Sequence, residues 1–160
     1  MFIKSLKEPY KSQAIQLYNK YKPELRKLPA SNSHHSNYPG GLYDHTLNVM
    51  ICTKELYICF SRIFDMYHTP LGFSYSKAIF TAFCHDLTKI YQYTKKPYRH
   101  HTKWSQQLFF DNKIKVDDMI INAMFNHHGS YGNRRGNPNA LSYIIHFADV
   151  WSSQILEVKE

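Results

Sequence analysis

Residues 42–66 read LYDHTLNVMICTKELYICFSRIFDM, and this stretch decides the fold. Its apolar side chains recur at helical spacing, and Pro and Gly occur only outside it. The stretch therefore predicts a long amphipathic helix whose inward stripe includes His45. A histidine on such a stripe must be hydrogen-bonded or must bind a metal. The stripe consists of Leu42, Val49, Leu56 and Ile63, joined by His45, Cys52, Cys59 and Met66, with the cysteines read as buried thiols.

The rest of the chain is divided by Pro and Gly into further helical patterns, and no alternating segments suggest a β-hairpin. A length of 160 residues fits one domain. We therefore expect an all-α fold, a compact helical bundle forming a single domain over residues 1–160. The expected helices are Tyr10–Leu25, Leu42–Met66, Ser74–Ile90, His101–Phe110, Val116–Asn126 and Asn139–Leu156.

Composition narrows the possible partners. No apolar run is long enough to span a bilayer, and the N-terminus lacks the apolar core of a signal peptide. We therefore expect a cytoplasmic protein without a membrane partner. The net charge of +8 suits a phosphate-rich partner such as nucleic acid. The charge is scattered along the chain, so an ordinary basic protein remains an alternative.

Four residues on three separate segments are candidate metal ligands. Asp86 shares a helical face with apolar residues, where an unpaired carboxylate would cost several kcal/mol, and a cation is its simplest partner. Two imidazoles and two carboxylates suit a divalent transition metal such as Mn, Fe, Ni or Co. A His-Asp dipeptide alone is a weak signal, because such pairs also occur by chance. The candidate ligands are His45, His85, Asp86 and Asp149.

Four runs carry a family resemblance: SNSHHSNYPGGLYDHTLNVM (31–50), FCHDLTKI (83–90), FNHHG (125–129) and IIHFADVWSSQ (144–154). In this order they resemble the HD-domain superfamily of metal-dependent phosphohydrolases. The resemblance implies an HD core over residues 29–156, with the N-terminal helix in residues 1–28 outside it. It also implies that His45, His85, Asp86 and Asp149 bind a divalent metal, with Mg added to the candidate ions.

Two closer resemblances concern the substrate. The run HHSNYPGGLYDHT (34–46) looks like part of the HD domain of 3′→5′ exoribonucleases. The longer run LPASNSHHSNYPGGLYDHTLNV (28–49) looks like the HD-type relaxases of conjugative elements. Both kinds of protein act on nucleic acid, so the resemblance implies a nucleic-acid or nucleotide substrate.

A further set of histidines resembles the two-metal subset of HD proteins. His101 (or His100), His127 and His128 match that subset by their order and imply a second ion. Surface histidines in a basic patch are the alternative for His100 and His101. The GYP run of cyclic-dinucleotide phosphodiesterases is absent. One ion or two is therefore left open.

Other residues are candidates for contacts with substrate. Lys89 matches the HDxxK variant of the family and could neutralise a scissile phosphate, or could be a solvated lysine at a helix end. His35 could touch substrate or hold its loop. His146 is expected to orient Asp149. In the loop after Gly129, Arg134 and Arg135 could grip phosphates and Tyr131 could stack on a base, although a merely solvated loop is an equal alternative.

The leading hypothesis is a phosphodiesterase or nuclease that cleaves single-stranded nucleic acid or short oligonucleotides with metal-activated water. Asp86, Lys89 and His127 are the expected catalytic residues. The runner-up is a nucleotide phosphohydrolase: a dNTP triphosphohydrolase, a 5′-nucleotidase or a cyclic-nucleotide phosphodiesterase. The third hypothesis is a domain that binds nucleic acid or a nucleotide without hydrolysing it. The sequence leaves metal identity, base preference, cleavage polarity and oligomeric state open.

Overall fold

The computed structural model describes residues 2–95, 100–129 and 136–157, and every regular element within these ranges is helical. The prediction of an all-α fold is confirmed. The elements are η1 (Phe2–Ser5), α1 (Tyr10–Leu25), α2 (Gly41–Met66), α3 (Tyr75–Cys84), α4 (Lys89–Thr94), η2 (His101–Trp104), α5 (Ser105–Asp111), α6 (Asp118–Asn126), α7 (Ala140–Trp151) and the π-helical segment η4 (Ser152–Leu156).

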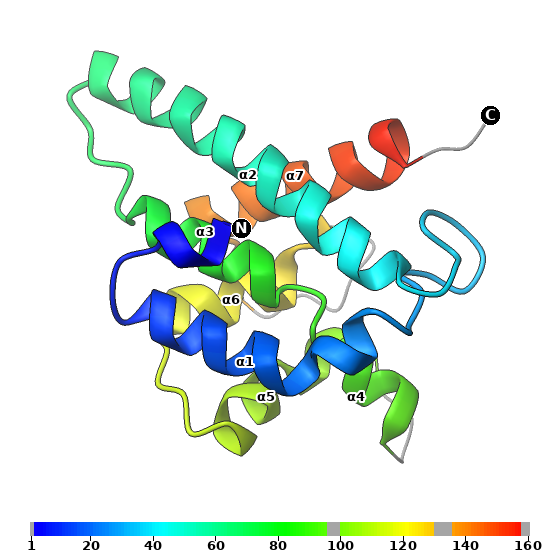
Figure 1. Cartoon of the computed structure of the whole chain (residues 1–160). Coiled ribbons are helices and arrows are strands. Elements are labelled where there is room, and N and C mark those ends of the chain that lie inside the picture. Colours follow the sequence, from blue (N-terminus) through cyan, green and yellow to red (C-terminus); the bar gives the residue numbers. More distant parts are fainter. Residues whose placement is uncertain (1, 96–99, 130–135, 158–160) are drawn as a thin grey trace.

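The long helix α2 crosses the molecule, and its C-terminal half projects past the helices packed against its beginning (Figure 1). The expected inward stripe is buried from Leu42 to Cys52. Beyond that point the expectation is wrong, because Cys59 and Ile63 are exposed and Met66 is 76% exposed. The stripe is therefore a core face only where α3 and α7 lie against it.

The expected helix over Ser74–Ile90 is interrupted. In the structure α3 ends at Cys84 and α4 begins only at Lys89. The turn between them carries His85 and Asp86. The prediction of one continuous helix is therefore wrong at the residues that matter most for the site.

A side chain explains where α3 ends. The ring nitrogen Nδ1 of His85 lies 2.6 Å from the carbonyl oxygen of Ala82. In a continuing helix that oxygen would accept the backbone N–H of Asp86. The imidazole thus takes over a carbonyl that the helix would otherwise use, and the chain turns.

Three other expected helices differ at their ends. The region His101–Phe110 begins as the 3₁₀ turn η2 before α5, and α6 starts at Asp118 behind an N-cap at Asp117. The last helix has its N-cap at Asn139, which forms a capping box with Ser142. It continues past Trp151 in the π-helical segment η4.

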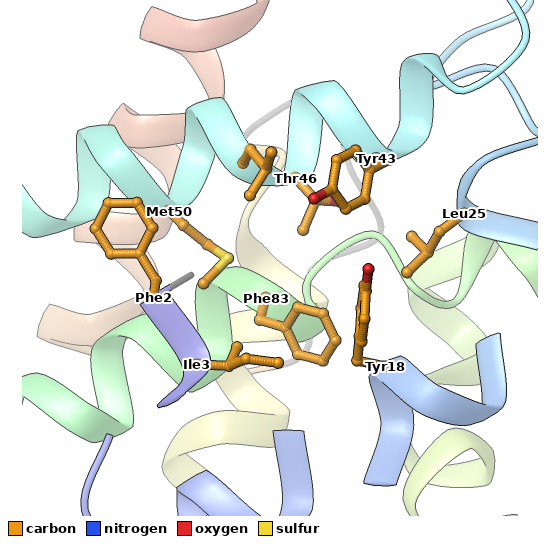
Figure 2. A pocket seen from close by; sticks show the side chains of 9 residues that line it. Phe2, Ile3, Tyr18, Leu25, Tyr43, Thr46, Met50 and Phe83 are labelled. Atoms are coloured by element: carbon orange, nitrogen blue, oxygen red, sulfur yellow. The ribbon is translucent and has the colours of Figure 1, made fainter. Parts of the chain in front are cut away.

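A small apolar cavity lies between the N-terminal segment, α1, α2 and α3 (Figure 2). Tyr43, Thr46 and Met50 line it from α2, and Tyr18 and Leu25 line it from α1. Its volume of about 10 Å³ is only about what one water molecule needs. We interpret it as a packing gap in the core that is too small for a substrate.

None of the helices in the described ranges has the length and apolar character required to cross a bilayer. The most buried helix is α3, whose Phe80 contacts Tyr10 of α1 and Phe109 of α5. This helix therefore joins the N-terminal part of the fold to the later helices.

We predict that Phe80→Ala lowers the free energy of unfolding by about 3–5 kcal/mol, because it leaves a large cavity at a fully buried position. The matched control is Phe110→Ala, since Phe110 is 79% exposed and its loss should cost less than about 0.5 kcal/mol. Urea unfolding of both variants measures the difference. Equal losses would contradict the assignment of α3 to the centre of the core.

Candidate metal centre

Two histidines follow the ends of helices and are held in the same way. His85 caps α3 and points Nδ1 at the carbonyl of Ala82, while His127 caps α6 and lies 2.7 Å from the carbonyl of Met124. A carbonyl oxygen only accepts, so each Nδ1 carries the proton. Each Nε2 is left with a free lone pair, which both rings direct into the interior.

The first group of candidate ligands is His45, His85 and Asp149, and all three are buried. Nε2 of His45 lies 3.3 Å from Nε2 of His85 and 3.2 Å from Oδ1 of Asp149. These residues come from α2, from the turn after α3 and from α7. The structure thus brings together three of the four residues expected at the first ion.

The second group is Asp86, His101, His127 and His128. Nε2 of His101 lies 3.3 Å from Nε2 of His127 and 3.1 Å from Nε2 of His128. His101 is buried, so it is not the surface histidine of the alternative interpretation. His100 is half-buried and bonds Thr102 instead, at 3.0 Å.

Asp86 lies between the two groups. Its Oδ2 is 3.3 Å from Nε2 of His45 and 3.5 Å from Nε2 of His85. Its Oδ1 is 3.1 Å from Nε2 of His101 and 3.7 Å from Nε2 of His127. Oδ1 is buried and accepts no hydrogen bond of acceptable geometry. One carboxylate thus offers an oxygen to each group of imidazoles.

The arrangement of these atoms fits a cation. Ligand atoms about 2.1 Å from one ion, at angles of about 90–110°, lie about 3.0–3.5 Å apart. The nitrogen–nitrogen distances of 3.1–3.3 Å in both groups fall in this range. Lone pairs that face one another in a buried space repel unless a proton or a cation lies between them. The cluster could therefore hold a metal ion.

The charge states also suit metal binding, which needs neutral imidazoles and ionised carboxylates. Burial lowers the pKa of His85 to about 4 and the pKa of His101 to about 3. Burial alone would raise the pKa of Asp86, but the Lys89 ammonium holds it well below its ordinary value. Burial alone would also raise the pKa of Asp149, but its hydrogen bond to His45 and the nearby imidazoles together lower it.

His45 is the exception among the imidazoles. Burial favours its neutral form, but Asp149, Asp86 and Glu157 together hold its pKa well above the ordinary value. Without a cation, a proton on His45 supplies the positive charge that these carboxylates need. A divalent ion would take over that role.

Lys89 is only 9% exposed, so it is not the solvated lysine of the alternative interpretation. Its Nζ lies 2.6 Å from Oδ2 of Asp86 and donates to the carbonyl of Ala30 at 2.6 Å. The structure therefore places the ammonium beside this cluster of candidate ligands, where it is the counter-ion of Asp86.

Two further histidines border the centre. His35 is half-buried, its ring lies 4.7 Å from the ring of His45, and its Nε2 is buried without a hydrogen-bond partner. His146 was expected to orient Asp149, but its Nδ1 lies 2.6 Å from the carbonyl of His127. That expectation is wrong, because the ring supports the chain at the second group instead. Tyr131, Arg134 and Arg135 lie outside the described residues.

Glu157 was missed by the sequence analysis. Its Oε1 is 2.9 Å from Nδ1 of His45, and the hydrogen bond with His45 helps to lower the pKa of Glu157 to about 2 against the effect of burial. The residue follows the last expected helix, which ends at Leu156, and no spacing rule connects it to α2. A chemical argument could have pointed to such a residue, because each ring nitrogen of a buried His45 needs a partner.

Comparison with known proteins places the chain in a family. The family described as "Putative helicase" (TraI_2) matches residues 5–107. The chain belongs to this family. The TraI_2 match includes His45, His85, Asp86, Lys89 and His101, and ends before the remaining candidate ligands.

One curated relative is the dihydroneopterin 2′,3′-cyclic phosphate phosphodiesterase of Methanocaldococcus jannaschii, which is 30% identical over 143 residues. The similarity covers 84% of this chain and 55% of the relative, so the chain spans about half the length of that protein. No solved structure gives a significant match.

We predict that Asp86→Asn strongly lowers the metal content of the purified protein, because both groups lose a shared charged ligand. Elemental analysis after dialysis against Mn²⁺ measures the ions bound per chain. The control is Asp44→Asn, since Asp44 is the exposed neighbour of His45 and bonds Tyr38. Equal metal content in Asp86→Asn and the unchanged protein would contradict the assignment.

Proposed function

We propose that this chain is an HD-type metal-dependent phosphodiesterase that cleaves single-stranded nucleic acid or short oligonucleotides. The single observation that carries the proposal is Asp86, whose two oxygens face two separate groups of imidazoles. Divalent ions held there would lower the pKa of water and polarise a phosphoryl oxygen. We place the HD core in residues 29–156 of a single domain.

The ligand sets follow from the two groups. We assign His45, His85 and Asp149 to one ion and His101, His127 and His128 to the other, with Asp86 between them. Five imidazoles favour Mn, Fe, Co or Ni over Mg, because Mg prefers oxygen ligands. The buried ammonium of Lys89 lies beside Asp86. Its positive charge would stabilise the negative charge that develops on the phosphoryl group of the substrate during attack.

Three observations support a phosphodiester as substrate. The relative from M. jannaschii is named for the hydrolysis of a cyclic phosphodiester, and the family is described as a helicase. The net charge of +8 favours polyanions.

A cyclic phosphodiester is the second candidate substrate. The name of the M. jannaschii relative specifies a 2′,3′-cyclic phosphate. The same cluster of ligands would serve either substrate, because both reactions attack the phosphorus of a diester. The two reactions differ in the leaving group and in the length of nucleic-acid strand that the protein surface must bind.

We predict that the Mn²⁺-loaded protein hydrolyses bis(p-nitrophenyl) phosphate, a diester, faster than p-nitrophenyl phosphate, a monoester. Asp86→Asn should lower the rate by on the order of 10²–10³-fold, as expected for the loss of several kcal/mol of transition-state stabilisation. Labelled RNA and DNA strands, dNTPs and 2′,3′-cyclic nucleotides then rank the natural substrates.

Cleavage of strands that falls steeply with added salt would support the nucleic-acid substrate, because several phosphates are then contacted. Preference for dNTPs would contradict it and favour a nucleotide phosphohydrolase. Absence of hydrolysis with every metal, with nucleotide or nucleic-acid binding unchanged in Asp86→Ala, would indicate a binding module.

His35 offers the substrate an unpartnered ring nitrogen next to the first group. We predict that His35→Ala raises KM for the diester by about 10-fold, the effect of losing one hydrogen bond to a charged group, while kcat changes less. Steady-state kinetics measure both constants. The matched control is His34→Ala, because His34 is exposed on the same loop. A normal KM in His35→Ala would leave the histidine only a role in holding the loop.

A further inference from the structure

Glu157 connects three parts of the chain at the edge of the metal centre. Its Oε1 faces Nδ1 of His45 at 2.9 Å and accepts from Nδ2 of Asn48 at 3.2 Å and from the hydroxyl of Ser152. Its Oε2 accepts from the hydroxyl of Ser36 at 2.5 Å. The side chain of Glu157 is almost fully buried. The two oxygens thus have different partners.

We propose that Glu157 is a positioning residue for the metal centre. Through Oε1 it keeps the proton of His45 on Nδ1, so that Nε2 presents its lone pair to the ion. Through Oε2 it holds the loop that carries His35 over the site. The inference rests on the proposed function, because it requires His45 to be a metal ligand.

His45 needs such a partner because of its place in the fold. His85 and His127 each donate Nδ1–H to a free carbonyl at a helix end. His45 lies in the first turns of α2, where the nearby carbonyl of Leu42 already accepts from the hydroxyl of Thr46 at 2.7 Å. A carboxylate from another segment therefore supplies the acceptor. Metal-bound histidines commonly donate their second N–H to such a group.

The loop needs an anchor for a separate reason. Ser36 is buried with φ of +46°, in the left-handed region, and its carbonyl accepts from the backbone N–H of Ala30 at 3.1 Å. A Cβ on Gly41 would lie 1.9 Å from that carbonyl oxygen, so the loop is folded tightly against the start of α2. The bond from Ser36 to Glu157 ties this closed loop to the C-terminal segment and leaves the adjacent His35 beside His45.

The test compares four variants in the full chain. Glu157→Ala removes both the contact with His45 and the contact with Ser36. Glu157→Gln keeps an acceptor without the charge, and Ser36→Ala removes only the contact of Oε2 with the Ser36 hydroxyl. Glu55→Ala is the control, because Glu55 is an exposed glutamate on the same helix as His45. Zn²⁺ affinity is measured by competition with a chelator, and Zn²⁺ content by elemental analysis. Diester kinetics and the melting temperature complete the comparison.

We expect Glu157→Ala to weaken Zn²⁺ binding by about 10–100-fold and Glu157→Gln to recover part of that loss. Ser36→Ala should keep its Zn²⁺ affinity and show a raised KM for the diester. In the Zn²⁺-loaded protein labelled with ¹⁵N-histidine, the Nδ1–H signal of His45 should be lost in Glu157→Ala and kept in Glu157→Gln. Loss of stability alone would not move this signal in the folded protein.

The outcomes separate the two proposals. Failure of the unchanged protein to bind Zn²⁺ or Mn²⁺ would remove the proposed function and this inference with it. Normal binding by the unchanged protein and by both Glu157 variants, with the same His45 signal, would overturn the positioning role alone. A third ion that is lost in Glu157→Gln would also overturn it, because Glu157, His35 and His45 could then share an ion directly. If Glu157→Ala does not fold, Glu157→Gln and Ser36→Ala decide the question.

Discussion

The buried carboxylate of Asp86 is the constraint on which the rest of the structure depends. It is 1% exposed, and an isolated charge at such a place would be costly by several kcal/mol. Lys89 pairs with it and imidazoles from four segments surround it, while its Oδ1 accepts no hydrogen bond. The packing of the helices can therefore be understood as a way to bring cationic or neutral nitrogen groups to one acidic side chain.

The ends of helices do most of this positioning. His85 and His127 follow α3 and α6 directly, and His101 starts η2. A side chain just beyond a helix has a free backbone carbonyl within reach, which fixes its ring and its tautomer. Side chains inside a helix lack that device, and His45 depends on Glu157 instead. The centre thus combines backbone acceptors with one carboxylate from a remote segment.

Much of this could be predicted from the sequence. Helical spacing indicated the all-α fold, the range of α1 and the burial of His45, and the order of the His and Asp residues indicated the cluster. Periodicity failed after Cys84, because the hydrogen bond from His85 to Ala82 ends α3 and no pattern of apolar residues encodes such a bond. It failed again at Met66, since a stripe specifies a face and not whether another element covers it. Glu157 was out of reach because, apart from Ser152, its partners lie more than a hundred residues away in the chain.

The ion pair of Lys89 with Asp86 has a consequence for the order of folding and metal uptake. With that ammonium and a proton on His45, two of the three negative charges carried by Asp86, Asp149 and Glu157 are balanced in the absence of an ion. These two positive charges reduce the repulsion among the carboxylates of the apoprotein, whereas small zinc domains fold only when the metal binds. We expect the chain to fold around this cluster before a metal ion binds. His45 would then release its proton when the ion takes its place.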